Sequence, residues 1–143
     1  MFAAGSALAG DILMPFVFAG NASGDVAAAS ADVKSKVTGA GFEVVGDYSP
    51  YAGANIIVVT SDALKANAAK TEFGAYGAVA RISVTKNGDN TEVVYTNPVY
   101  MSAAYRMDGD NSDVRAALEG ALGAEKDFGS EKDLTAEDLR KYH

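Results

Sequence analysis

The sequence has 143 residues, no cysteine and a formal net charge of -7. The length fits one domain with a full hydrophobic core, and 48% apolar against 22% charged residues indicates a globular chain. The negative charge argues against nucleic acid as a partner, because phosphate binding needs a basic face. The lack of cysteine excludes disulfides, thiolate nucleophiles and cysteine metal ligands.

The first nine residues are apolar, small and uncharged, and Ala7-Leu8-Ala9 has the small-x-small form of a signal-peptidase site. A full export signal would also need a basic region and a longer apolar run, and both are missing. We interpret residues 1–10 as the end of an export signal or a disordered N-terminus, and we expect a periplasmic or secreted protein. No stretch approaches the ~20 apolar residues needed to span a bilayer, so we expect no membrane insertion.

The chain then predicts a strand followed by a helix. The apolar run Ile12–Ala19 predicts the strand, and Pro15 either places it at a sheet edge or delays its start to Phe16. The helix is expected over Asp25–Thr38, with Ser23 as its N-cap and glycines that stop it.

Two strands follow, over Phe42–Tyr48 and Ala54–Thr60. The second contains four consecutive apolar residues, Ile56–Val59, which indicates a central strand buried on both faces. Ser61 is then expected to cap a second helix over Asp62–Lys70.

The stretch Ala78–Arg106 reads as two strands that fold back on each other and lead into a short helix. Its first strand alternates apolar and polar residues, the period-2 pattern of a half-buried strand. Lys86–Asn90 is a turn cluster, and Thr91–Thr96 resumes the alternation. Asn97 then acts as N-cap of a helix that opens with Pro98, because proline cannot donate to a strand ladder.

The remaining chain predicts two helices separated by a polar linker over residues 125–133. The first is expected over Val114–Leu122 and ends at Gly123. Thr135 and Asp138 approximate a capping box before the second.

Because three strand connections are short, we expect an α+β fold with a mainly antiparallel sheet and helices on one face. We assign a single α+β domain to residues 11–123 and a C-terminal helical extension to residues 124–143.

The part of the chain from the first predicted helix to the end of the hairpin segment resembles a bacterial family, the domain of unknown function 302. The shared features are a two-faced apolar strand, an alanine-rich helix and a strand that ends Tyr95-Thr96-Asn97-Pro98, and Gly41–Val45 fits the family's opening. The resemblance runs from residue 25 to residue 107 and leaves the C-terminal extension outside. It implies a curved antiparallel sheet of four to five strands backed by helices, distantly like half of the TATA-box-binding protein fold. It implies no activity.

A group of aromatic residues suggests a ligand site near the end of the hairpin. Tyrosines with one arginine can line a pocket for a small anionic or aromatic ligand. We assign such a site to Arg81, Tyr95, Asn97, Tyr100 and Tyr105. The alternative is that the rings pack against the sheet with their hydroxyls at the rim, or form a dimer surface.

A weak candidate for a metal site lies in the acidic segment after the short helix. Asp108, Asp110, Ser112 and Glu119 occupy positions 1, 3, 5 and 12 of a calcium-loop template. Asp113 replaces the glycine expected at position 6. The alternative is a solvated loop whose acids cap a helix N-terminus.

The single histidine, His143, is the other weak metal candidate. Together with Met14, Met101 or Met107 it could ligate a haem or copper, since thioethers suit both. The alternative is that the methionines belong to the core and the histidine is exposed.

The sequence therefore favours an exported domain that binds a ligand or a partner, catalyses no reaction and holds no cofactor. We also expect a homodimer, paired through sheet or helix faces, because alanine-rich helices leave flat surfaces. One alternative is a metal- or haem-linked redox accessory protein or enzyme that uses the C-terminal extension. The other is a purely structural or interaction protein.

Overall fold

The structure is a computed structural model that describes residues 10–141, so the predicted signal-peptidase site and His143 lie outside the described residues. Its main sheet has six antiparallel strands, which are β2 (Phe16–Ala22), β3 (Glu43–Tyr48), β4 (Ala54–Thr60), β5 (Ala80–Asn87), β6 (Asn90–Thr96) and β7 (Lys126–Phe128). Their order across the sheet is β3-β4-β5-β6-β2-β7. A small second sheet pairs β1 (Ile12–Leu13) with β8 (Leu134–Thr135).

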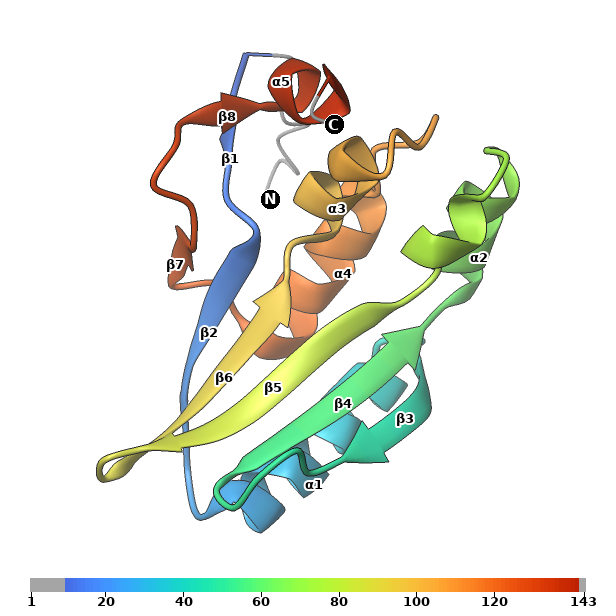
Figure 1. Ribbon diagram of the computed structural model, residues 1–143. Helices are drawn as coiled ribbons and strands as arrows, with labels where there is room; N and C mark the ends of the chain where they lie inside the picture. The colour runs from blue at the N-terminus through green and yellow to red at the C-terminus, as the bar shows by residue number, and fades with distance from the viewer. Residues whose placement is uncertain (1–9, 142–143) are drawn as a thin grey trace.

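The helices lie behind the main sheet and at one end of it (Figure 1). They are α1 (Val26–Gly39), α2 (Asp62–Ala69), α3 (Pro98–Ala104), α4 (Ser112–Leu122) and α5 (Ala136–Lys141), with a 3-10 turn, η1 (Gly74–Gly77). Helices α1 and α4 cover one face of the sheet, which confirms the predicted α+β fold class. None of the described helices is long and apolar enough to cross a membrane.

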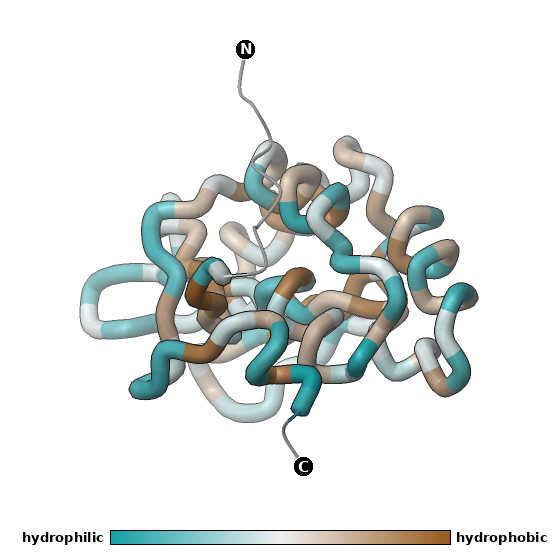
Figure 2. The backbone as a smooth tube through the Cα atoms, turned by 90° about the horizontal axis from the view of Figure 1, so that it is seen from above, coloured by the Kyte–Doolittle hydropathy of each residue, from teal (hydrophilic) through white to brown (hydrophobic). Residues whose placement is uncertain are grey.

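The core lies between the sheet and the two covering helices. Side chains of alternate strand residues point into it, as the period-2 pattern requires. Its members with at most 2% exposure include Val17, Val33, Val37, Ile57, Val59, Leu64, Ala80, Ile82, Val84, Tyr95, Val114 and Leu118. Figure 2 shows the same arrangement from above, with hydrophobic segments gathered in the middle and hydrophilic segments mainly at the periphery.

A second, smaller core joins the two ends of the described chain. Leu13 from β1, Ala103 from α3 and Leu139 from α5 form it, each less than 10% exposed. The guanidinium of Arg140 donates a 2.6 Å hydrogen bond to the carbonyl of Met107, which ties α5 to the loop after α3.

The predicted helix caps are confirmed at three places. The backbone N–H of Val99 donates to Oδ1 of Asn97 at 3.2 Å, and Pro98 opens α3. Ser61 accepts from the N–H of Leu64. In the capping box before α5, the N–H of Thr135 donates to Asp138 at 2.9 Å, and the N–H of Asp138 donates back at 3.3 Å.

The prediction of Ser23 as the first N-cap was wrong. The cap of α1 is Asp25, whose Oδ1 accepts from the N–H of Ala28 at 2.8 Å. Gly24 has a φ of +85°, so the chain turns there and brings the aspartate, not the serine, to the helix start.

The strand count was also wrong, since the sheet has six strands where four to five were expected. The additional strand is β7, which lies in the segment predicted to be a polar linker. It pairs with β2 in the register Phe16↔Phe128, and these two rings lie 5.8 Å apart between centroids. Only one of the three β7 residues is apolar, so the strand carries no recognisable alternation.

The predicted burial of β4 on both faces was wrong in an informative way. The strand lies between β3 and β5, and its inward residues Ile57 and Val59 are fully buried. Its outward residues Ile56 and Val58 are only partly buried and belong to neither core. Figure 1 shows that no described helix covers the face toward which they point.

A matched pair of substitutions tests this difference between the two faces. Ile57→Thr places a hydroxyl and a void in the core, so we expect it to lower the free energy of unfolding by about 3 kcal/mol. Ile56→Thr makes the same chemical change on the uncovered face, and we expect a loss below about 1 kcal/mol. Urea unfolding of dilute protein measures both, and equal losses would contradict the assignment of the faces.

Candidate functional site

The structure does not bring the five predicted ligand-binding residues together. Tyr95 pairs with Ile82 across β5 and β6, and both side chains are buried on the helix-covered side. Arg81 is the neighbour of Ile82, so it points to the opposite side of the sheet, where it is exposed. Thr96 lies beside Arg81 and accepts a 3.1 Å hydrogen bond from its backbone N–H. The sheet therefore separates Arg81 from Tyr95.

The other three predicted residues have separate surroundings. Asn97 is 1% exposed, and its Nδ2 donates at 2.9 Å to the carbonyl of Met14 while its Oδ1 caps α3. Tyr100 packs against the smaller core, and Tyr105 is 43% exposed at the end of α3. None of the five lines the groove beside β2 described below, or the smaller hollow between the α1–β3 turn, the start of α2 and α4. Ligand binding by this set stays a prediction, and Asn97 has a structural role.

Tyr95 is the centre of a charged cluster that attaches β7 to the core. Its hydroxyl donates to the carbonyl of Gly123 at 2.9 Å, and burial raises the pKa of Tyr95 to about 12. The guanidinium of Arg115 lowers this pKa, while Glu119 and Asp127 raise it. Arg115 donates two hydrogen bonds to Asp127, at 3.1 and 2.9 Å. Burial lowers the pKa of Arg115, but the hydrogen bonds and charge of Asp127, together with the charges of Tyr95 and Glu119, raise it overall.

Replacing Tyr95 with phenylalanine tests this environment. The pKa of the hydroxyl is 10.0 in the reference state and about 12 in the folded protein. Between these values the folded protein binds more protons than the unfolded chain, so stability falls as the pH rises. We expect wild type to lose stability above about pH 10 more steeply than Tyr95→Phe, which lacks about 1 kcal/mol of hydrogen bonding at neutral pH.

Urea unfolding at pH 8 and at pH values up to about 11 measures this difference, within the window in which a tyrosine hydroxyl titrates. Tyr51→Phe is the control, because Tyr51 is 65% exposed. The Tyr95→Phe and wild-type stabilities should converge with rising pH. Parallel pH dependences would contradict a buried, protonated hydroxyl.

The side chains of two of the four candidate calcium ligands, Asp110 and Glu119, make other contacts in this structure. Asp110 accepts from the backbone N–H of Ser112 at 2.9 Å, and this contact lowers the pKa of Asp110. Glu119 lies 3.7 Å from Nε of Arg115. Over residues 10–141, no three histidine, cysteine, aspartate or glutamate side chains are grouped so that they could hold a metal ion. Met107 is fully buried, whereas the histidine proposed as its co-ligand lies outside the described residues.

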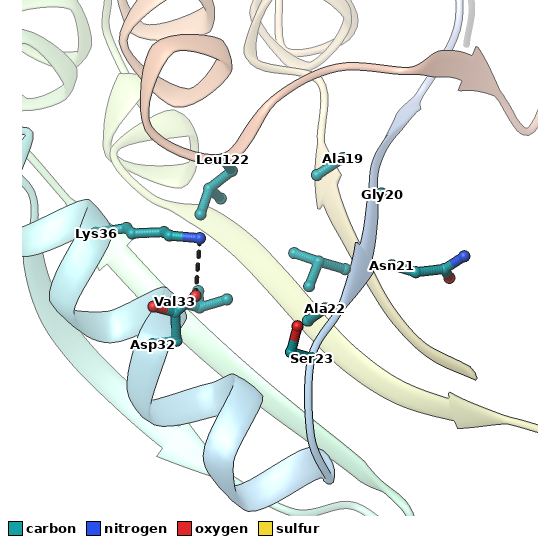
Figure 3. A pocket seen from close by; sticks show the side chains of 10 residues that line it. Ala19, Gly20, Asn21, Ala22, Ser23, Asp32, Val33, Lys36 and Leu122 are labelled. Atoms are coloured by element: carbon teal, nitrogen blue, oxygen red, sulfur yellow. Dashed lines mark ion pairs between the residues drawn. The ribbon is translucent and has the colours of Figure 1, made fainter. Parts of the chain in front are cut away.

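A groove of about 430 Å³ lies between β2, α1 and the end of α4 (Figure 3). Its lining includes the apolar side chains of Val33 and Leu122, and an ion pair of 2.8 Å between Lys36 and Asp32 lies on its α1 side. Both charged side chains are about half exposed. Sequence reasoning missed the groove, because β6 and α4, which contribute Val93 and Leu122, lie far along the chain from β2 and α1.

The uncovered face of the main sheet, here called the outer face, is the other candidate surface. The register aligns a central row of outward residues across all six strands, namely Tyr48, Ile56, Ser83, Val94, Phe18 and Lys126. A row on one side of it contains Val58, Arg81, Thr96, Phe16 and Phe128. A shorter row on the other side contains Ala54, Thr85, Glu92 and Asn21.

About half of the residues in these three rows are apolar, and few are charged. Its exposed aromatic side chains are Tyr48 at 53%, Phe16 at 39% and Phe128 at 36%. Within the three rows, the charged residues are Arg81, Glu92 and Lys126. Exposed aromatic residues together with few charges are typical of a surface that binds another protein.

Comparison with solved structures finds a protein with the same fold, from the family that the sequence resembles. The crystal structure of the uncharacterized conserved protein DUF302 from Bacillus stearothermophilus matches with a TM-score of 0.66 and 14% sequence identity, and the match covers 76% of this chain and 96% of that chain. This chain resembles the domain of unknown function 302 family. At this identity the likeness shows the fold alone. Comparisons with protein-family models and with curated proteins find no match.

Proposed function

We propose that this protein is a non-catalytic binding domain that self-associates through its outer face. The observation that carries the proposal is β4, a strand with apolar residues on both faces but a covering layer on only one. Ile56 and Val58 point away from the helices and pack in neither core. Continuous apolar strands occur where both faces of a sheet are covered. A second sheet packed on the outer face would supply the missing layer.

The character of the outer face supports a protein as the partner. The three charged residues in its rows include two cations and one anion, on a chain with a net charge of -7. Nucleic acid needs a concentrated basic surface, which this face does not provide. Aromatic residues such as Phe16 and Tyr48 are the kind enriched at protein interfaces.

Export from the cytoplasm is part of the proposal. It is supported by the Ala7-Leu8-Ala9 pattern and by the complete lack of cysteine in the sequence. A cysteine-free chain is compatible with an oxidising compartment, because it cannot form wrong disulfides there.

The variant Val94→Lys tests self-association, because Val94 lies in the middle of the central row. A charge buried without a partner is costly, so this variant should be monomeric. We expect wild type to dimerise between about 1 and 100 μM, where interfaces of moderate affinity dissociate. Sedimentation velocity measures both. Ala27→Lys adds the same charge at an exposed position of α1 and should leave the dimer intact. A wild type that stays monomeric over this range would contradict the proposal.

A second candidate function is the binding of a small polar molecule in the groove beside β2, favoured by the paired charges of Lys36 and Asp32. A molecule that carries both an ammonium and a carboxylate group could pair with each of them. This ligand class differs from the anionic or aromatic one predicted from the tyrosines.

Thermal-shift measurements with glycine, aspartate and arginine as probes test this second function. We expect at least one probe to raise the melting temperature of wild type, because a ligand that binds only the folded state stabilises it. The shift should disappear in Lys36→Met. It should persist in Lys65→Met, since Lys65 is part of a similar exposed pair with Asp62 on α2. No shift with any probe, or an equal shift in both variants, would contradict the assignment.

A further inference from the structure

The outer face carries two opposite charges at matching positions. Arg81 on β5 lies two residues from Ser83 in the central row, and Glu92 on β6 lies two residues from Val94 in the opposite direction along the sheet. The two charges therefore lie on adjacent strands, on opposite sides of the apolar row. Such a pattern decides which symmetric pairings of two copies are favourable.

Two simple two-fold arrangements can place one outer face on another. In the first, the symmetry axis runs along the central row, at about a right angle to the strands. Each strand then lies over its own copy with the direction reversed. Arg81 of one copy then lies over the row that contains Glu92 of the second copy. The two residues are one strand spacing apart across the sheet, about 4.8 Å, and an arginine side chain is long enough to span this offset.

In the second arrangement the axis runs along the strands, between β5 and β6. The two copies then keep the same direction along the strands, and β5 of each lies over β6 of the other. Arg81 of one copy then lies one strand spacing from Arg81 of the other copy, and the two Glu92 residues are placed in the same way. Like charges so placed repel one another, and such contacts are strongly unfavourable inside an interface.

We infer that two copies of this chain pack outer face to outer face about an axis that crosses the strands, with reciprocal Arg81–Glu92 ion pairs between the copies. This inference rests on the proposed self-association and specifies its geometry. In such an isologous interface the central row meets its own copy, so Ile56, Val94 and Phe18 form the apolar centre. Lys126 also meets its own copy in this arrangement, but it is exposed at the β7 edge of the row, where both long side chains can extend into water.

The contacts of the two charged residues support the pairing. Over residues 10–141, the guanidinium of Arg81 has no hydrogen-bond or ion-pair partner, although the residue stands among apolar and hydroxyl side chains. The carboxylate of Glu92 is oriented by a 3.0 Å hydrogen bond from Nδ2 of Asn87, and it lies partly exposed on the same face. One charge is thus unpaired, and the other is held in place with further lone pairs available.

Charge reversal with reciprocal rescue tests the arrangement in the full chain. Arg81→Glu and Glu92→Arg should each raise the dimer dissociation constant by about tenfold or more, because each creates two like-charge contacts across the axis. The double variant Arg81→Glu with Glu92→Arg should restore the wild-type value within about threefold. Dissociation of wild type should also increase with salt, since partly exposed ion pairs are screened.

Two controls separate the geometry from other effects. Lys132→Glu makes the same change in net charge as Arg81→Glu, but in the exposed loop before β8, and it should leave the dissociation constant unchanged. Asn87→Ala removes the hydrogen bond to Glu92 without altering charge, and it should weaken the dimer less than Glu92→Arg does. Circular-dichroism melting of each variant establishes that it is folded.

The outcomes distinguish this inference from the proposed function. A dimer that Val94→Lys disrupts but that the double variant fails to restore would overturn the axis and leave the outer face as the interface. A wild type that remains monomeric would overturn both, and the outer face would then have to serve a different protein. Rescue in the double variant, with no effect of Lys132→Glu, is the result that we expect.

Discussion

The structure depends on the pleat of the central β5–β6 pair, since it decides which side of the sheet each residue faces. Asn87 pairs with Asn90, so the loop between the strands consists of Gly88 and Asp89. Gly88 has a φ of +61°, the conformation that a tight hairpin of this kind needs at its first loop residue. A slip of one residue would bring Arg81 into the core and move Ile82 into water.

Much of this arrangement can be predicted from sequence periodicity and capping chemistry. Alternation predicted β5 and β6, and Asn97 with Pro98 predicted the start of α3, because these signals are local. The pairing itself was also accessible: a two-residue loop at Gly88 makes Tyr95 the partner of Ile82 and places Arg81 on the other side. The tyrosines cluster along the chain, but alternation along the strands puts Arg81 and Tyr95 on opposite sides of the sheet. The predicted pocket is therefore not assembled.

Other features could not be predicted, because they arise from contacts between distant segments. The polar residues of β7 pair with β2, and two contacts hold them there: Arg115 on α4 binds Asp127, and Phe128 meets Phe16. The apolar run of β4 predicted burial on both faces, but periodicity does not tell whether a cover for the second face comes from the same chain. The groove beside β2 depends on the position of α4, which no local pattern specifies.

The position of β2 has a consequence for the order of folding. This strand pairs with β6 and β7, so its partners come from the second half of the chain, whereas β5 and β6 are neighbours in sequence. Closing long loops is slow compared with closing short ones. The hairpin can therefore form during synthesis, but the early residues must wait for Phe128 before the sheet acquires its last strand. Until then the edge of β2 is open to strands of other molecules, and a chaperone that shields this edge would improve the yield of native protein.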